Sequence, residues 1–201
     1  MTVRDIIFAD NPILREKSKK VKNFGEALQV LIDDMVETMH AANGLGLAAP
    51  QIGVLERVIV IQLPAPPSPP KLGGTGGHDE EDPQSGKFFT LCNPQIIRAE
   101  GEEESEEGCL CLPGWVGEVK RATSVIVKAQ DRRGKKVRIK AEGFLARVFQ
   151  HESDHLNGIL YIDRVESPDK LRRIVPPEES EEDESENAQE KEEEKEGTKH
   201  E

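Results

Sequence analysis

The stretch FLARVFQHESDHLN, residues 144–157, decides both the fold and the chemistry expected of this chain. It predicts a helix whose apolar residues press it against a sheet and which ends at Asn157-Gly158. His151 and His155 are four residues apart, so they share one face of that helix and can bind one metal ion together. Glu152 lies beside them as a candidate general base.

An HExxH pattern can also arise by chance on an exposed helix, with ordinary surface or core histidines. Three features favour the metal site. The helix has an apolar face, formed by Phe144, Leu145, Val148 and Phe149. Asp154 is a carboxylate that could orient a ligand or support the helix from outside the ligand set. The chain has five histidines, and two of them fall at this spacing.

The third ligand is expected to be a sulfur or a carboxylate, because catalytic zinc-type sites usually have three protein ligands and one open position. A third histidine six residues downstream is excluded by Tyr161. Glu166 is the nearest downstream carboxylate. Upstream, the segment EGCLCLP, residues 107–113, offers the Cys109 thiolate for a Cys–His–His site. The simpler interpretation of Cys109 is a small buried residue.

The segment GLGLAAPQ, residues 44–51, predicts a tight loop along which a substrate backbone could lie. Gln51 can present an amide donor to an oxyanion. Taken alone, this segment is more often a packing loop than the wall of an active site.

These three segments, in this order, resemble the three signature motifs of the peptide deformylases. The resemblance covers most of residues 3–165. It implies a metal-dependent hydrolase that removes the N-formyl group from the formyl-methionine of nascent bacterial and organellar chains. It implies a single-domain α+β fold with mixed or antiparallel β-sheets packed around the HExxH helix. It also implies one divalent metal, naturally Fe(II), with Zn(II), Ni(II) or Co(II) as substitutes.

Carried over position by position, the resemblance assigns roles to ten residues. The metal ligands would be Cys109, His151 and His155. The acid/base residue would be Glu152, and the oxyanion would be held by Gln51 and the backbone N–H of Leu110. The substrate backbone would pair with Gly46, and the methionine side chain would lie among Leu45, Phe144 and Val148.

Cys111 departs from the family pattern, which usually has serine at this position. It lies two residues from Cys109 and could compete for the metal. This leaves two rival interpretations. One is a non-catalytic zinc-stabilised binding module with ligands Cys109, Cys111, His151 and His155. The other is an HExxH endopeptidase with Glu166 as third ligand, which would leave the segments 44–51 and 107–113 without a role.

The rest of the chain predicts helices and strands in an α+β order. A helix is expected over residues 25–42, after a short strand or extended arm and a loop over 5–22. Strands are expected at 57–63, 88–91, 94–99, 116–119, 124–130, 136–142 and 159–162.

Charge divides the chain of 201 residues unevenly. The formal net charge is −12, and residues 176–201, with thirteen Asp or Glu and three Lys, carry −10 of it. We therefore expect a catalytic domain over residues 1–175 and a disordered acidic tail over 176–201. The segment 64–86, rich in proline and glycine, is expected to be a mobile insertion loop.

The expected partners are formyl-methionyl nascent peptides, with a ribosomal role implied by the resemblance. No basic patch for nucleic acid stands out, since the run RRGKK at 132–136 fits a solvated hairpin turn, and an acidic tail would be repelled by rRNA. No apolar run approaches the roughly 20 residues of a membrane span. Three cysteines without disulfide spacing, and no transit segment, favour the bacterial cytoplasm. The oligomeric state does not follow from the sequence.

Overall fold

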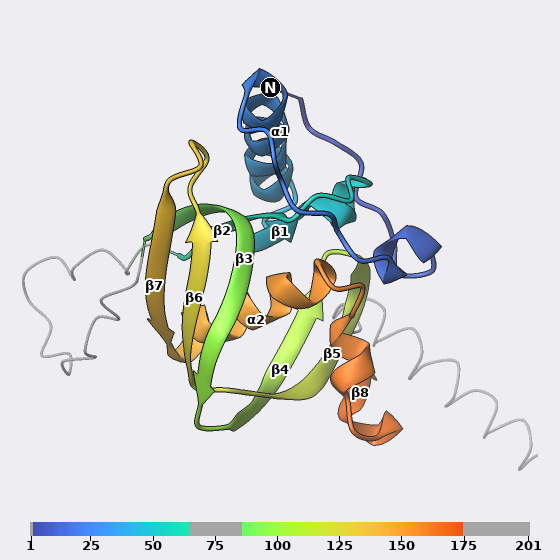
Figure 1. Ribbon diagram of the computed structural model, residues 1–201. Helices are drawn as coiled ribbons and strands as arrows, with labels where there is room; N and C mark the ends of the chain where they lie inside the picture. Colours follow the sequence, from blue (N-terminus) through green and yellow to red (C-terminus); the bar gives the residue numbers. More distant parts are fainter. Residues whose placement is uncertain (1, 65–85, 175–201) are drawn as a thin grey trace, which may run out of the picture.

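The helix α2, Gly143–His155, lies between two antiparallel sheets (Figure 1). The computed structural model describes residues 2–64 and 86–174. A five-stranded sheet has the order β1-β2-β3-β6-β7, with bounds Gly46–Ala48, Val58–Gln62, Phe88–Glu100, Ser124–Gln130 and Lys136–Glu142. A three-stranded sheet has the order β4-β5-β8, with bounds Glu103–Cys109, Leu112–Arg121 and Leu171–Arg173. The expected α+β fold around the HExxH helix is confirmed.

Strand β2 shows why the run VIVI is apolar at every position. Ile59 and Ile61 pack with α2, while Val58 and Val60 pack on the opposite face with α1, Glu26–Ala41. A strand covered by a helix on both sides has no solvated face, so it needs no polar residue.

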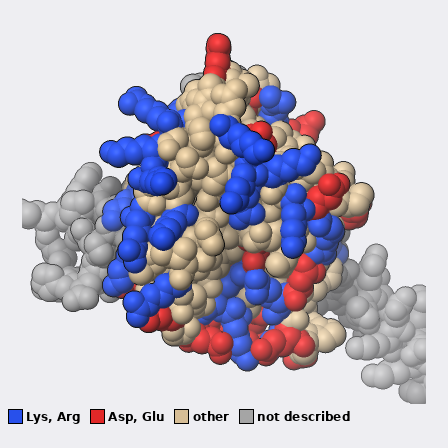
Figure 2. Space-filling view, viewed as in Figure 1, with Lys and Arg blue, Asp and Glu red and all other residues tan. Residues whose placement is uncertain are grey.

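Strand β6 has one buried and one exposed face. Val125, Val127 and Ala129 are buried with α2, whereas Lys128 between them is exposed, because successive side chains of a strand point to opposite faces. Lysine and arginine gather on the outer face of β3, β6 and β7, which is the face turned to the viewer in Figure 2.

The observed strands differ from the expected ones at three places. Residues 88–91 and 94–99 belong to one strand, β3, whose register shifts between Cys92 and Gln95. The acidic stretch before Cys109 forms strand β4, because its partner β5 and cations from other segments, such as Arg172 in its ion pair with Glu106, compensate for low strand propensity. Residues 159–162 form no strand but lead into a 3-10 helix, Tyr161–Arg164.

Short 3-10 helices complete the described chain, at Pro12–Arg15, Ala49–Ile52 and Pro168–Lys170. The expected insertion loop, apart from its end residues 64 and 86, and the expected acidic tail lie outside the described residues. Within the described ranges, no helix is long and apolar enough to span a bilayer.

Candidate active site

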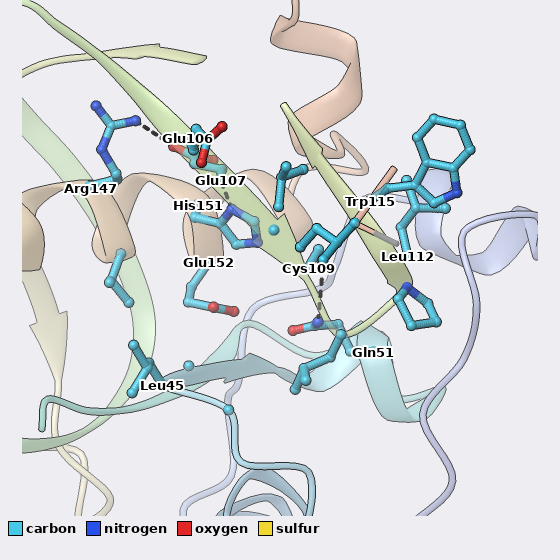
Figure 3. A pocket seen from close by; sticks show the side chains of 18 of the residues that line it. Leu45, Gln51, Glu106, Glu107, Cys109, Leu112, Trp115, Arg147, His151 and Glu152 are labelled. Carbon is cyan, nitrogen blue, oxygen red and sulfur yellow. Dashed lines mark hydrogen bonds and ion pairs between the residues drawn. The ribbon is translucent and has the colours of Figure 1, made fainter. Parts of the chain in front are cut away.

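A pocket of about 400 Å³ opens beside α2 and is walled by the segments 44–51 and 106–116 (Figure 3). Nine of the ten residues assigned from the sequence line it: Leu45, Gly46, Gln51, Cys109, Leu110, Phe144, Val148, His151 and Glu152. The tenth, His155, is 1% exposed and lies deeper in the protein. The fold therefore brings three segments that are far apart in the sequence to one cavity.

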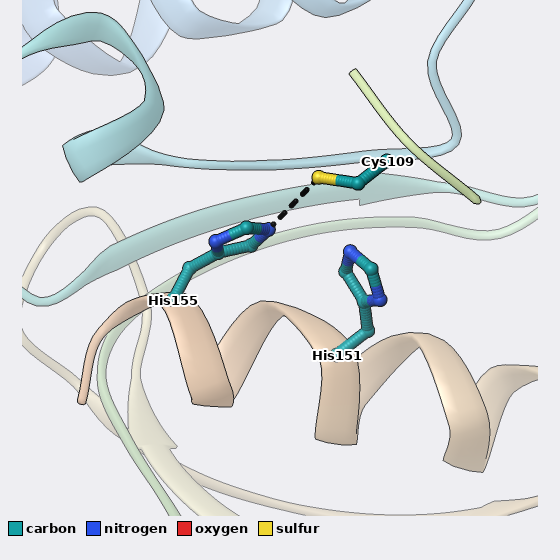
Figure 4. A group of neighbouring side chains, drawn as sticks. All are labelled: Cys109, His151 and His155. Atoms are coloured by element: carbon teal, nitrogen blue, oxygen red, sulfur yellow. Dashed lines mark hydrogen bonds between the residues drawn. The ribbon is translucent and has the colours of Figure 1, made fainter. Parts of the chain in front are cut away.

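Two turns of α2 and the end of β4 bring three possible metal ligands together (Figure 4). One donor atom from each of Cys109, His151 and His155 lies within 4.8 Å of the other two. The Cys109 Sγ is 3.3 Å from the His155 Nε2. A thiolate and two imidazoles suit a divalent transition metal and leave a coordination position open.

Different contacts make the two imidazoles available as metal ligands. The Nδ1 of His151 bonds the Glu107 carboxylate at 2.9 Å, which leaves its Nε2 for the metal. Burial holds the pKa of His155 well below its usual value, so this ring is neutral, as a metal ligand must be. Its buried Nδ1 has no partner among the residues that the structure describes. The donor set fits a bound metal ion.

Glu107 is the centre of a buried ionic network behind His151. Arg121 donates two hydrogen bonds to it, at 2.8 and 2.9 Å, and Arg147 donates one at 2.9 Å. Burial raises the pKa of Glu107, but hydrogen bonds from Arg121 and His151 outweigh this and lower it to about 2. Arg121 also contacts Asp154 at 2.5 Å. Asp154 thus acts on the site through Arg121 and Glu107, not as a direct partner of a histidine.

Glu152 is buried against Gly46 at the edge of the pocket. A Cβ placed on Gly46 would lie 2.8 Å from the Glu152 Cδ, so the approach requires glycine. The Glu152 Oε2 has no hydrogen-bond partner in the described part of the chain. Burial raises its pKa to about 7. This carboxyl group can therefore exchange a proton near neutral pH.

The amide of Gln51 has a fixed orientation in its 3-10 helix. Its Oε1 accepts a hydrogen bond from the Ala48 N–H at 2.7 Å. Its Nε2 consequently faces the two sulfurs, 3.6 Å from Cys109 Sγ and 3.3 Å from Cys111 Sγ. A donor held next to the metal ligands can meet an oxygen that gains negative charge.

Sequence reasoning did not assign Glu107, Arg121 or Arg147 to the site. Glu107 begins the segment 107–113, and a carboxylate two residues before a metal ligand is a signal for a supporting partner. Arg147 lies four residues before His151 on α2, a spacing that places both on one face. Nothing in the local sequence distinguishes Arg121 from a solvated strand arginine.

Two geometric facts disfavour the rival interpretations. Glu166, the third ligand of the endopeptidase alternative, is paired with Lys120, its oxygens 2.8 and 3.0 Å from the Lys120 Nζ. Cys111, the fourth ligand of the structural-zinc alternative, lies outside the group of three donors.

A buried carboxyl group beside a Cys–His–His donor set is the arrangement of a metallohydrolase, and that is the class of enzyme this fold and site define. Comparison with known proteins gives the family. Residues 3–171 match the family model described as polypeptide deformylase. A peptide deformylase of Thermomicrobium roseum is 48% identical over 182 residues, 90% of this chain and 96% of the relative. One from Dehalococcoides mccartyi is 43% identical over 183 residues, 91% of this chain and 98% of the relative.

Comparison with solved structures points to the same family. The crystal structure of a peptide deformylase from Legionella pneumophila has a TM-score of 0.70 and 43% identity, and the match covers 84% of this chain and 89% of that one. A peptide deformylase from Synechococcus elongatus, in complex with actinonin, has a TM-score of 0.70 and 38% identity over 83% of this chain and 81% of that one. The chain belongs to the peptide deformylase family. It is a hydrolase that removes the N-formyl group from nascent peptides.

Proposed function

We propose that deformylation depends on Glu152 as the acid/base residue, with Cys109, His151 and His155 holding one divalent metal. The observation that carries this proposal is the position of Glu152, buried next to the three donors with one carboxyl oxygen unpartnered. A carboxyl oxygen without a hydrogen-bond partner is costly to bury, and its use in proton transfer gives that cost a function.

The proposed metal is Fe(II), with Zn(II), Ni(II) and Co(II) as substitutes. The donor types suit iron and zinc equally, and the preference for iron comes from the family resemblance. When bound, such an ion supplies Lewis acidity and makes a water molecule a nucleophile near neutral pH.

The proton transfers are assigned to one side chain. Glu152 takes a proton from the attacking water and then delivers it to the leaving amine. Its pKa, raised by burial to about 7, suits both transfers near neutral pH.

Two hydrogen-bond donors are proposed to stabilise the negative charge that develops on the formyl oxygen. These are the side-chain Nε2 of Gln51 and the backbone N–H of Leu110, which lies in the turn between β4 and β5. Each such donor contributes about 3 kcal/mol in other hydrolases.

The substrate is proposed to enter as an added strand. In the described sheet β1 pairs only with β2, so its other edge is open beside the pocket, and an extended peptide can pair with Gly46 there. The methionine side chain would lie among Leu45, Phe144 and Val148. Leu45 and Phe144 are exposed large apolar residues, 38% and 48%, and a bound side chain would cover them.

The biological setting is proposed from the substrate. Nascent formylated chains emerge from ribosomes, so the enzyme is proposed to act there, in the bacterial cytoplasm. The catalytic domain is proposed to comprise residues 1–175, with 64–86 as an insertion and 176–201 as an acidic appendage.

The decisive assay is formate release from formyl-Met-Ala-Ser by anaerobically purified enzyme. A Glu152→Ala variant should bind metal and release no formate, and Glu152→Gln, which keeps the side-chain volume, should behave alike. Cleavage of an internal peptide bond without formate release would favour the endopeptidase alternative. Formate release at the wild-type rate by Glu152→Gln would refute the assigned role.

A further inference from the structure

A second hollow, of about 900 Å³, is lined by β3, β6, β7 and the segments before α1 and β2, and every charged residue that lines it is a cation. These cations are Lys17, Lys20, Arg57, Lys128, Lys136 and Arg138. The uncharged part of the lining is Ser18, Asn93, Pro94, Gln95, Ala129, Gln130 and Val137. We call this surface the basic groove. Three of its cations, Lys128, Lys136 and Arg138, belong to β6 and β7.

The cations of the groove lie close to one another although like charges repel. Lys128 on β6 is directly opposite Arg138 on β7, and like charges directly opposite in a sheet are destabilising. Lys136 precedes Arg138 by two residues and so shares its face. None of the groove's six cations forms an ion pair with a residue of the described ranges.

The other sheet shows the contrast. There Lys120 pairs with Glu166, and Arg172 pairs with Glu106, at 2.8 and 2.7 Å. These two exposed cations are neutralised by neighbouring acids, whereas those of the groove are not. A solvated face explains isolated lysines, but it does not explain a concave surface from which acids are absent.

Arg57 and Asn93, which line the groove, are held by hydrogen bonds to backbone groups. Arg57 donates to the carbonyl oxygens of Leu156 and Pro94, at 3.2 and 3.0 Å, and has no acidic partner. Asn93 has a left-handed backbone, φ 54°, at the register shift of β3. Its side chain bonds both backbone groups of Val21, at 2.9 and 3.0 Å. Both side chains are therefore held in place within the groove.

We propose that the basic groove binds the phosphate backbone of RNA. Alternate residues of a strand are about 6.8 Å apart, so Lys136 and Arg138 present charge at a regular spacing to a repeating anion. The lining contains no aromatic residue, whereas protein interfaces depend on buried aromatic anchors. It also lacks the large apolar side chains by which interfacial segments enter a lipid surface.

The choice of RNA over DNA rests on the proposed action at the ribosome. Residues 1–175 carry only −2 of the net charge of −12; the excess acid lies in residues 176–201, which repel RNA and lower the affinity of the full chain without removing the groove's charges. The groove and the peptide pocket share no lining residue, so RNA can bind while the pocket stays open.

The test measures binding of the full-length, metal-loaded enzyme to labelled RNA, as a single strand and as a duplex of about 16 base pairs. DNA of the same sequence and poly-glutamate are the comparison ligands. Anisotropy titrations at several salt concentrations, from about 50 to 200 mM, give the slope of log K against log salt. Lys136→Gln/Arg138→Gln removes two groove charges. Lys120→Gln/Arg172→Gln removes the same charge from the other sheet and is the control.

We expect salt-dependent RNA binding that is weakened about tenfold or more in the groove variant, with a slope shallower by about 1.4 to 1.8. The control variant should bind as the wild type does. Absence of salt-dependent RNA binding, equal loss in both variants, or equal affinity for DNA or poly-glutamate would overturn the proposal. Formate release from formyl-Met-Ala-Ser should be unchanged in both variants, so failure of the deformylase assignment would be seen separately.

Discussion

Gly46 on β1 and Glu152 on α2 are in such close contact that no side chain fits between them: a Cβ on Gly46 would lie 2.8 Å from Cδ and 3.0 Å from Cγ of Glu152. A Gly46→Ala substitution must therefore displace the proposed acid/base group. We expect kcat to fall by about tenfold or more, since displacements of this size are costly in catalysis, while metal content is retained.

Gly108→Ala is the matched control for this prediction. Gly108 also lines the pocket, but a Cβ there meets no atom closer than 3.6 Å. It should retain most of the activity, and equal losses in the two variants would show that the Gly46–Glu152 contact has no special role. Formate release and metal analysis provide the measurements.

Glu107 should control metal affinity without touching the metal. Its carboxylate bonds His151 Nδ1 at 2.9 Å, and such supporting partners change metal affinity about 10- to 100-fold. Glu107→Gln should weaken metal binding to this extent in a chelator competition. Glu106→Gln, one residue away and exposed, is the control and should leave the affinity unchanged.

The metal-free protein should gain stability when Glu152 is neutralised. Burial raises the pKa of Glu152 from 4.5 to about 7, so the folded state binds this proton more tightly than the unfolded state. The carboxyl group then makes stability fall as pH rises from 4.5 to 7, and its full cost, roughly 3 kcal/mol, is present above 7.

Urea unfolding of metal-free Glu152→Gln at pH 8 and pH 5 measures this effect. The gain over wild type should be large at pH 8 and small at pH 5. Glu107→Gln should show the opposite sign, because the pKa of Glu107 is lowered to about 2 and its stabilisation is present above 4.5. A Glu152→Gln variant less stable than wild type at pH 8 would contradict the argument.

The two motif cysteines should respond differently to substitution by serine. Cys111 lies outside the group of three donors and accepts a hydrogen bond from Gln51, a role that a hydroxyl can take over. Cys111→Ser should keep metal and activity, whereas Cys109→Ser should change both. Metal content and formate release test this, and loss of metal in the Cys111 variant alone would reverse the ligand assignment.

The iron enzyme should lose activity in air, because oxygen oxidises the metal or the Cys109 thiolate. Formate release by iron- and nickel-loaded samples, followed over time in air and under nitrogen, measures this loss. We expect the nickel sample to decay more slowly. An oxygen-stable iron enzyme would contradict the prediction.

The sequence by itself determined the local parts of this enzyme. The helix with His151 and His155 at four-residue spacing, and the buried run of β2, follow from periodicities within a few residues. The order of three motifs then identified the family. These features are readable because helix and strand geometry fixes which neighbours along the chain share a face.

Only the tertiary structure decided which distant charges meet. Glu107 bonds Arg121, 14 residues away, and His151, 44 residues away. An acidic stretch in which no strand was expected therefore contains a buried carboxylate and forms a strand. The basic groove likewise combines cations from separate segments, and no run of sequence displays it. The physical reason is that the free energy of a charge depends on its burial and its partners in space, which the linear order of residues does not specify.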